Sequence, residues 1–299
     1  MELHHHHNTT SSKKLLFSIF LNIGITVSQV IGGFLSGSLA LLSDALHNFT
    51  DVISLIISYI ASVFSKKTAS TQKTFGYKRA EILAAFVNAL SLIVISVILI
   101  KEAVERFISP QEIESNLVII LSFVAIIGNG ISVWLLKADS SRNMNMKSAY
   151  LHLFTDMLAS VAVLIGGLLM KYYQIFWIDS LLTLLIALYL IIMSWDLLKK
   201  SYRVLMLFTP NDIDVKTIVE HMHNIEGVSK FHHVHVWQLN EDEVHLEAHL
   251  QFAGDISLSK FDKILVEIEQ SLKDKFNINH VTIQPEFNKV DPKDIIVQD

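Results

Sequence analysis

Cysteine is absent from this chain of 299 residues, which excludes disulfide bonds, thiolate nucleophiles and cysteine-based zinc sites. Charge is also scarce: Asp, Glu, Lys and Arg make up 18% of the residues, against roughly 25% in soluble globular proteins. Hydrophobic residues make up 51%, and the mean hydropathy is +0.44. No basic cluster suggests that the chain binds nucleic acid, and the net charge of −5 says little about partners. This composition indicates a membrane protein.

Two further absences concern the N-terminus and catalysis. Residues 1–12 are polar and lack the small-residue cleavage pattern of a signal peptide. They include a run of histidines, His4 to His7, which is either a natural metal-catching tail or the remnant of an expression tag, and we expect this segment to be disordered. The string His-Glu-x-x-His, which would place a catalytic base beside a metal, does not occur. We therefore do not expect an enzyme such as an intramembrane metalloprotease.

Six apolar runs follow the polar tail of residues 1–14, and each is about long enough for the ~20 residues that a membrane span needs. A turn signal, Ser36-Gly37-Ser38, separates the first two runs, and Ser109-Pro110 ends the third. The sequence predicts a six-helix transmembrane domain of residues 15–207. Its spans are expected near residues 15–35, 39–64, 80–107, 117–136, 149–171 and 175–198.

The loops between these runs differ in positive charge. Thirteen Lys and Arg residues lie near the termini and the loops on one side of the membrane, whereas the loops on the opposite side have only Lys101, Arg106 and Lys171 nearby. Since Lys and Arg accumulate in cytoplasmic loops, the bias predicts that both termini lie in the cytoplasm. The residues on the cytoplasmic side are Lys13, Lys14, Lys66, Lys67, Lys73, Lys78, Arg79, Lys137, Arg142, Lys147, Lys199, Lys200 and Arg203.

After residue 207 the pattern changes to that of a small soluble domain. Apolar residues recur with helical spacing in two segments, and alternation with period two indicates strands between and after them. The order helix, two strands, helix, strand predicts an α+β sandwich, αββαβ, of about 80 residues, which is large enough for a modest core. The expected elements are 212–225, 228–238, 243–252, 257–276 and 280–284, within a domain of residues 208–288 that a polar tail of residues 289–299 follows.

One motif occurs twice within the apolar runs, as Leu-His-Asn-Phe-Thr-Asp at 46–51 and as Leu-His-Leu-Phe-Thr-Asp at 151–156. Each copy places a His four residues before an Asp, and residues i and i+4 share one face of a helix. If the two helices meet, His47, Asp51, His152 and Asp156 offer two nitrogens and two oxygens to one point. Such a tetrad suits a divalent metal such as zinc.

The cost of these residues argues for a use. An Asp at the centre of a membrane span costs roughly 2.5–3.5 kcal/mol on insertion scales. The structural alternative is a polar network that only holds helices together, for which Ser, Thr or Asn is enough. The sequence alone does not show that the motifs meet, but duplicated transporters build midplane sites from matching helices of their repeats.

Asp44 is a further intramembrane acid, three residues before His47 on the same helical stripe as Asp51. It is a fifth ligand, a partner that orients His47, or an acid on the path by which metal enters, and we favour the last two roles. Asn48 and Asn129 are weaker candidates, since most intramembrane Asn residues connect helices.

Several strings spread along the chain match one known family. They are Gly37-Ser38-Leu39-Ala40-Leu41-Leu42-Ser43-Asp44-Ala45 before His47-x-x-x-Asp51, Phe75-Gly76-Tyr77-Lys78-Arg79-Ala80-Glu81, His152-x-x-x-Asp156, His232-His233-Val234-His235-Val236-Trp237 and Ala248-His249-Leu250. Together they resemble the cation diffusion facilitators over residues 13 to 287. The resemblance implies a homodimer in the lipid bilayer, with six spans per chain and a ferredoxin-like cytosolic domain. It also implies export of zinc (Zn2+) from the cytoplasm in exchange for protons.

The resemblance also assigns residues. His47, Asp51, His152 and Asp156 match the transport site position by position, in the version typical of zinc-type members. Some bacterial relatives have a second site in the loop after the second span, and we expect it to be absent here because residues 70–77 contain no ligand. The chain also lacks the long His-rich insert of many eukaryotic relatives, which favours a bacterial plasma (inner) membrane protein.

Histidines in the cytosolic domain suggest a second metal site. His249 faces away from the apolar side of its strand, and His232 shares parity with Val234 and Val236, so we expect it near the core edge. The structural alternative is a solvated polar face of the sheet. The resemblance implies a site made by His232, His249 and Glu286.

Two departures from the family affect that site. Gln284 and Asp262 replace histidines that relatives use, so we expect a reduced or rearranged site. Five further histidines of the domain are surface candidates only: His221, His223, His233, His235 and His245.

The mechanism that fits these features is antiport. Zinc needs neutral His and deprotonated Asp, so zinc and protons compete for one tetrad. Alternatives are the same fold carrying mainly cadmium, cobalt or manganese, or a passive metal channel or receptor that does not respond to a proton gradient.

Overall fold

The computed structural model describes residues 9–65, 69–140 and 144–297, apart from the side chains of 9–16, 51, 54–55, 58–59, 61–63, 65, 138–140 and 144–149. His4 to His7 and the side chain of Asp51 therefore lie outside the described part. The chain forms two compact units, one of residues up to 57 with 87–197, and one of residues 58–86 with 198–299.

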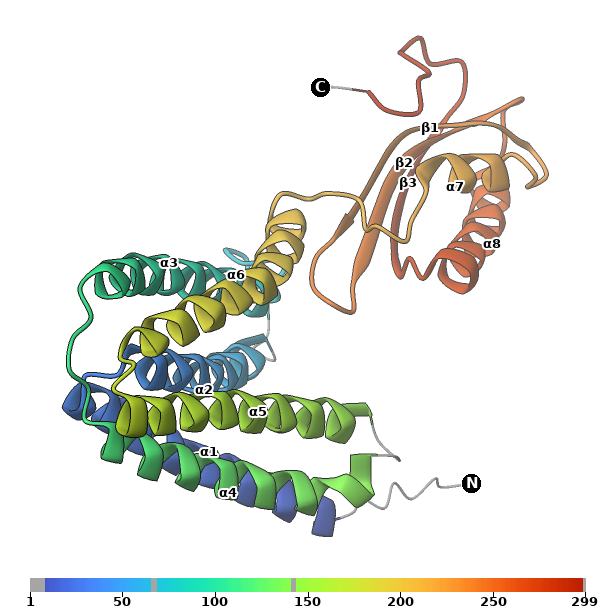
Figure 1. The fold of residues 1–299 in the computed structure, drawn as a ribbon. Helices are drawn as coiled ribbons and strands as arrows, with labels where there is room; N and C mark the ends of the chain where they lie inside the picture. Colours follow the sequence, from blue (N-terminus) through green and yellow to red (C-terminus); the bar gives the residue numbers. More distant parts are fainter. Residues whose placement is uncertain (1–8, 66–68, 141–143, 298–299) are drawn as a thin grey trace. The chain divides into compact units, whose positions relative to one another are not determined.

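Six long helices make up most of the first unit and extend into the second (Figure 1). Among the described residues, five of them are long and apolar enough to cross a membrane: α1, α3, α4, α5 and α6. The other, α2, has 27 residues, and several of its side chains between 51 and 65 are not described. The expected helical membrane domain is confirmed. The helices are α1 (Thr9–Ser36), α2 (Leu39–Ser65), α3 (Ala80–Ile108), α4 (Ser115–Ser140), α5 (Met144–Tyr173) and α6 (Trp177–Leu205).

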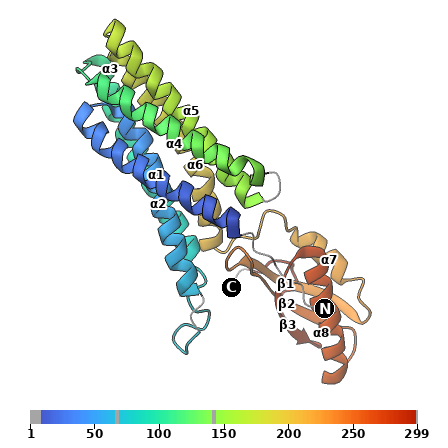
Figure 2. The same ribbon diagram turned by 90° about the horizontal axis from the view of Figure 1, so that it is seen from below.

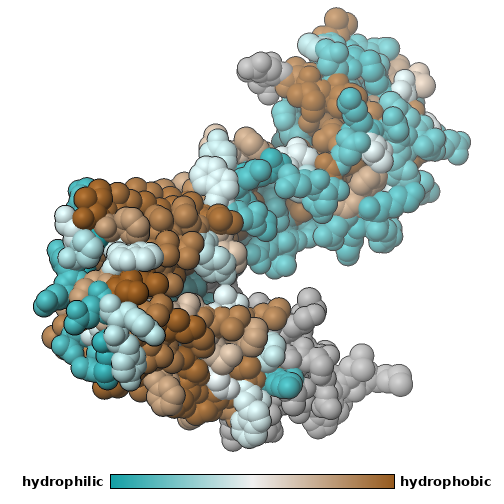
Figure 3. Space-filling model, viewed as in Figure 1, coloured by the Kyte–Doolittle hydropathy of each residue, from teal (hydrophilic) through white to brown (hydrophobic). Residues whose placement is uncertain are grey.

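The outward faces of these helices are apolar, as the brown surface of the helical unit in Figure 3 shows. Phe20, Ile98 and Ile192 are examples, each more than half exposed. So much exposed apolar surface is unfavourable in water and suits contact with lipid.

Within the bundle, α1, α4 and α5 lie side by side in both ribbon views (Figures 1 and 2). Gly167 of α5 faces α4 so closely that an added Cβ would lie 3.0 Å from Cγ1 of Ile119. The absence of a side chain there lets the two backbones approach, as is common between membrane helices.

A cluster of hydrogen bonds stabilises the tight turn between α1 and α2. Gly37 adopts a left-handed conformation, with φ +71°, which a residue with a side chain rarely adopts. The carboxylate of Asp179, in the first turn of α6, accepts from the backbone N–H of Leu39 at 2.8 Å and from the Ser38 hydroxyl. Arg106 of α3 donates to the Gly37 carbonyl. Asp179 of α6 thus caps the start of α2, and Arg106 of α3 holds the turn before it, which the sequence pattern did not reveal.

The cytosolic domain has the expected order αββαβ. Its three strands pair in the order β1-β2-β3, with β1 antiparallel to β2 and β2 parallel to β3, and α7 and α8 cover one face of the sheet (Figures 1 and 2). Buried apolar residues between sheet and helices form its core, including Ile218, Met222, Phe231, Leu246, Leu250, Ile268 and Leu272. The elements are α7 (Val215–Met222), β1 (Val228–Gln238), β2 (Val244–Phe252), α8 (Leu258–Phe276) and β3 (His280–Glu286).

A β-bulge in β1 corrects one expectation. His233 has φ +50°, and the register of β1 against β2 shifts between His232 and His235. A bulge adds a residue to one strand, so parity is not preserved across it. The expectation that His232 lies near the core edge, on the same face as Val234, is therefore wrong: His232 pairs with His249, on the sheet face opposite to the core.

Candidate metal centres

The two copies of the repeated motif meet inside the helical unit. One oxygen of the buried Asp156 lies 3.8 Å from Nε2 of His47, and its other oxygen lies 3.5 Å from Nε2 of His152. The two imidazole rings are 6.0 Å apart and nearly perpendicular. Thus α2 and α5 bring three of the four predicted transport-site residues together.

These separations suit a metal ion. One ligand atom from each of His47, His152 and Asp156 can be chosen so that all lie within 4.8 Å of one another. With zinc–ligand bonds near 2.0 Å, tetrahedral geometry places ligand atoms about 3.3 Å apart, so a small contraction completes the arrangement. Asp51 follows His47 by one helical turn in α2 and belongs to the same face, although its side chain is not described.

A cavity of about 320 Å³ opens beside these residues. Its polar wall is formed by Asp44, His47, Thr155 and Asp156, from α2 and α5. The remaining wall is apolar and comes mainly from α5 and α6: Leu158, Ala159, Ala162, Leu182, Leu185, Ile186, Tyr189 and Leu190. An ion that enters this cavity finds its polar groups gathered on one side.

Asp44 is fully buried and belongs to a hydrogen-bonded network. Its Oδ2 accepts from Nε2 of Gln29 at 2.7 Å and from the Ser160 hydroxyl at 3.3 Å, while Asn48 donates to Gln29. The network joins α1, α2 and α5 beside the cavity. Asp44 thus lines the space next to the His47–Asp156 pair, and its role there stays a prediction. Asn129 is buried in α4.

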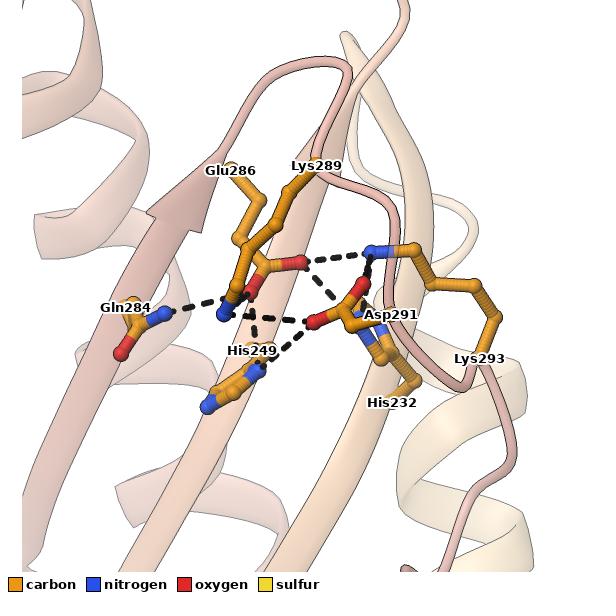
Figure 4. Close-up of polar contacts among 7 residues, drawn as sticks. All are labelled: His232, His249, Gln284, Glu286, Lys289, Asp291 and Lys293. Carbon is orange, nitrogen blue, oxygen red and sulfur yellow. Dashed lines mark hydrogen bonds and ion pairs between the residues drawn. The ribbon is translucent and has the colours of Figure 1, made fainter.

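The predicted cytosolic residues also converge (Figure 4). Nε2 of His232 lies 3.3 Å from one oxygen of Glu286, and Nδ1 of His249 lies 2.9 Å from its other oxygen. His232 is completely buried and Glu286 is 4% exposed. The sheet positions the residues, since His232 and His249 are register partners and Glu286 ends β3.

Three residues that the sequence reasoning missed complete this cluster. Asp291 approaches His249 at 3.9 Å, and Lys289 and Lys293 form ion pairs with both Glu286 and Asp291. All three belong to a segment without regular secondary structure, where neither periodicity nor a motif marks them. Only the alternation of Lys, Asp and Lys at every second position was available as a signal.

The charges in the cluster shift one another. Burial would raise the pKa of Glu286, but hydrogen bonds from Lys289 and Lys293 outweigh it and hold this pKa below its usual value. Hydrogen bonding by Lys293 lowers the pKa of Asp291 to about 2. Burial, with the Lys293 ammonium nearby, lowers the pKa of His232 and favours the neutral imidazole that a metal requires.

The donor set fits a metal such as zinc. Two imidazoles and two carboxylates offer four ligand atoms within 4.8 Å of one another. Nδ1 of His232 is buried, and among the described residues it has no hydrogen-bond partner. Two residues of this domain replace histidines of the family pattern. Gln284 donates to Glu286 at 3.1 Å, whereas Asp262 is exposed on α8.

The expectation for the remaining histidines is wrong at one position. His245 is buried, because its ring stacks on Trp237 and lies 4.3 Å from the ring of His280. Its strand position faces away from the core, as alternation predicted, but neighbouring rings cover it. His221 is half-buried and hydrogen-bonded to Ser271, and His223 is exposed.

Known proteins resemble the chain in both parts. The family model of the cation efflux transmembrane domain matches residues 15–206, and that of the cytoplasmic domain of cation efflux proteins matches residues 210–287. A cadmium, cobalt and zinc/H(+)-K(+) antiporter of Bacillus subtilis is 37% identical over 274 residues, 91% of this chain and 88% of that protein.

Two other relatives are similar over comparable lengths. The metal cation efflux system protein CzcD of Cupriavidus metallidurans is 37% identical over 87% of this chain and 82% of its own length. The zinc transporter ZitB of Escherichia coli is 36% identical over 91% of this chain and 87% of its own length. The chain therefore belongs to the cation efflux family, the cation diffusion facilitators, and is a multi-pass membrane transporter of divalent metal cations rather than an enzyme.

Proposed function

We propose that this transporter exports Zn2+ from the cytoplasm in exchange for protons, at a site formed by His47, Asp51, His152 and Asp156. The observation that carries the proposal is the position of Asp156, 3.8 and 3.5 Å from the imidazoles of the two motifs. The relatives add support, since one is named a zinc transporter and another an antiporter of cadmium, cobalt and zinc.

Competition between zinc and protons supplies the coupling. Zinc binds neutral imidazole and ionised carboxylate, so protonation of these groups releases the metal, and metal binding releases protons. Unperturbed His titrates near pH ~6.5, within reach of the pH on either side of a cell membrane. A tetrad that is open alternately to each side then moves zinc outward and protons inward.

The rest of the assembly follows from charge and from the domain match. Both termini lie in the cytoplasm in this proposal, because Lys and Arg concentrate in the loops on that side. A transmembrane domain of residues 15–207 precedes a cytosolic domain of residues 208–288, through which two chains form a homodimer. The bacterial relatives favour the plasma membrane of a bacterium. The cytosolic domain holds a resident metal at His232, His249 and Glu286.

A second candidate is the same transporter with another main substrate. The names of the relatives include cadmium and cobalt, and His and Asp ligands bind those metals as well. Competition of unlabelled cadmium, cobalt and manganese against zinc flux separates these readings. Zinc as main substrate predicts that none of them inhibits as strongly as unlabelled zinc does.

The test removes both imidazoles of the transport site. Variant His47→Asn with His152→Asn should lose most zinc flux, and any remaining flux should no longer follow the pH dependence of the wild type. The measurement is zinc uptake by inside-out vesicles between pH 6 and 8. The control, His223→Asn, changes an exposed histidine of the cytosolic domain and should transport normally. Wild-type flux and pH dependence in the double variant would contradict the proposed site.

A further inference from the structure

The segment after β3 folds back over the cytosolic metal centre. Asn288, with φ +51°, turns the chain just after Glu286. The backbone carbonyls of Asp294 and Ile295 then accept from His233 at 3.1 Å and from Val234 at 2.8 Å. His233 and Val234 lie in the bulge of β1, and Ile295 packs against the apolar core. The segment is thus anchored at both ends and covers His232 between them.

Its side chains enter the group of ligands. Nζ of Lys293 lies 2.7 Å from Glu286 and 3.2 Å from Nε2 of His232, and it forms an ion pair with Asp291. Nζ of Lys289 lies 2.8 Å from the other oxygen of Glu286 and 3.2 Å from the other oxygen of Asp291. In Figure 4 both ammonium groups point into the space between the carboxylates.

An ammonium group competes with a metal ion for these atoms. Nε2 of a neutral imidazole has one lone pair, and Lys293 lies 3.2 Å from that of His232, while two positive charges beside the carboxylates repel an incoming cation. Lys293 alone contacts three of the four potential ligands, Glu286, Asp291 and His232. Metal binding here therefore requires Lys293 to leave Nε2 of His232, and it is favoured when both ammonium charges move away from the ligands.

The charge balance matches such an exchange. Glu286 and Asp291 carry two negative charges, and Lys289 and Lys293 carry two positive charges, around two imidazoles. A divalent cation brings the same charge as the two ammonium groups that it replaces. The two carboxylates are thus neutralised before and after the exchange, which avoids the large cost of leaving the buried Glu286 unpaired.

We infer that residues 289–293 form a lysine clamp, in which Lys289 and Lys293 occupy the cytosolic centre in its metal-free form and are displaced by a divalent metal, while Asp291 becomes the fourth ligand. This inference rests on the proposed metal binding by His232, His249 and Glu286. The clamp raises the metal concentration at which the site fills, and it couples filling to movement of the segment. The alternative is a permanent ion-pair cluster that replaces the metal altogether.

The first test measures affinity at the cytosolic centre. Full-length protein in nanodiscs, carrying His47→Asn and His152→Asn to remove the transport site, is titrated with cobalt(II), whose visible spectrum reports tetrahedral binding. Adding Lys289→Met with Lys293→Met should lower Kd by about tenfold, the effect expected if the clamp is closed about 90% of the time. The matched control, Lys263→Met with Lys275→Met, changes two exposed lysines of α8 and should leave Kd unchanged.

Asp291→Asn, in the same background, separates the clamp from the site. The variant should bind cobalt more weakly and lose part of the tetrahedral spectrum, because it removes a ligand. Circular dichroism establishes that each variant is folded. An unchanged Kd in the lysine variant overturns the clamp. Absence of cobalt binding in every variant overturns both the clamp and the proposed cytosolic metal site.

The second test follows the segment itself. Because the chain has no cysteine, a single Val290→Cys substitution at a fully exposed position accepts one nitroxide label. Zinc should increase the mobility of this label in the electron spin resonance spectrum, and the increase should be absent in a variant with His232→Ala. Unchanged mobility at saturating zinc overturns the clamp. Zinc flux through wild-type protein from the same preparation tests the proposed transport function separately. If the protein carries no zinc, the transport proposal fails, but the cobalt affinities and the label mobility still decide whether the clamp exists.

Discussion

A single carboxylate connects the two halves of the proposed transport site. Asp156 directs one oxygen to His47 of α2 and the other to His152 of its own helix. The i,i+4 spacing within α5 sets one of these contacts, and helix packing sets the other. Because Asp156 is buried between the two imidazoles, a bound cation would supply the stabilisation that its carboxylate loses on leaving water.

Another residue gives a pH prediction for the cytosolic domain. Burial, and then the neighbouring His280, lowers the pKa of His245 below its usual value. As the pH falls, His245 is therefore protonated in the unfolded chain before it is protonated in the folded one. The stability that neutral His245 contributes is present above about pH 6.5 and is lost as the pH falls below this value. We expect the unfolding temperature to fall between pH 7.5 and 5.5, and to fall less in His245→Phe.

Thermal unfolding of the full-length protein, followed by tryptophan fluorescence, measures this difference. His223→Phe is the control, because His223 is exposed and should leave the pH dependence unaltered. An equally steep pH dependence in His245→Phe would show that this histidine is not held neutral by its surroundings.

The sequence identified residues well where chemistry and spacing coincide. His47, His152 and Asp156 could be found because a duplicated motif repeats both the residue types and their helical spacing. Asp291 and the two lysines could not be found, since their positions depend on how an irregular segment returns to the sheet. No local pattern encodes that return.

At the scale of elements, the cap on α2 gives a stability prediction. Asp179 accepts from the N–H groups of Leu39 and Ala40 and from the Ser38 hydroxyl. Asp179→Ala leaves these buried donors without their acceptor and should destabilise the helical unit by about 1–2 kcal/mol, as expected for a lost helix cap. Asp179→Asn keeps one acceptor oxygen and should cost less.

Thermal denaturation in detergent compares these variants with Glu105→Ala, which removes an exposed acid from α3. Glu105→Ala should unfold at the same temperature as the wild type, Asp179→Asn at a lower temperature, and Asp179→Ala at the lowest temperature of the three. If Asp179→Ala unfolds with the wild type, the cap does not stabilise the start of α2.

Elements were more predictable than their limits. Apolar runs located all six long helices, but α5 begins at Met144, five residues before the expected 149, and α6 continues to Leu205. Helical hydrogen bonds continue into polar flanks that hydropathy excludes. The earlier start of α5 places its motif deeper in the helix. The bulge at His233 was missed because strand parity assumes an unbroken register.

At the scale of the whole molecule, the two candidate metal centres differ in their surroundings, and we expect them to serve different purposes. The helical unit places His and Asp beside a cavity with a largely apolar wall, which suits an ion that binds and leaves. The cytosolic domain covers its ligands with their own counter-cations, which suits a site that fills only when metal is abundant. The family could be read from the sequence because both units carry its motifs, whereas the covering segment belongs to this chain's tertiary structure.

The central claim, proton-driven export of zinc at the Asp156 site, is tested most directly by zinc flux in inside-out vesicles with and without an imposed pH gradient. An acidic interior should drive zinc uptake by wild-type protein, collapse of the gradient should stop net accumulation, and Asp156→Asn should abolish uptake under both conditions. Zinc accumulation that is the same with and without the gradient, or that persists in Asp156→Asn, would contradict the account.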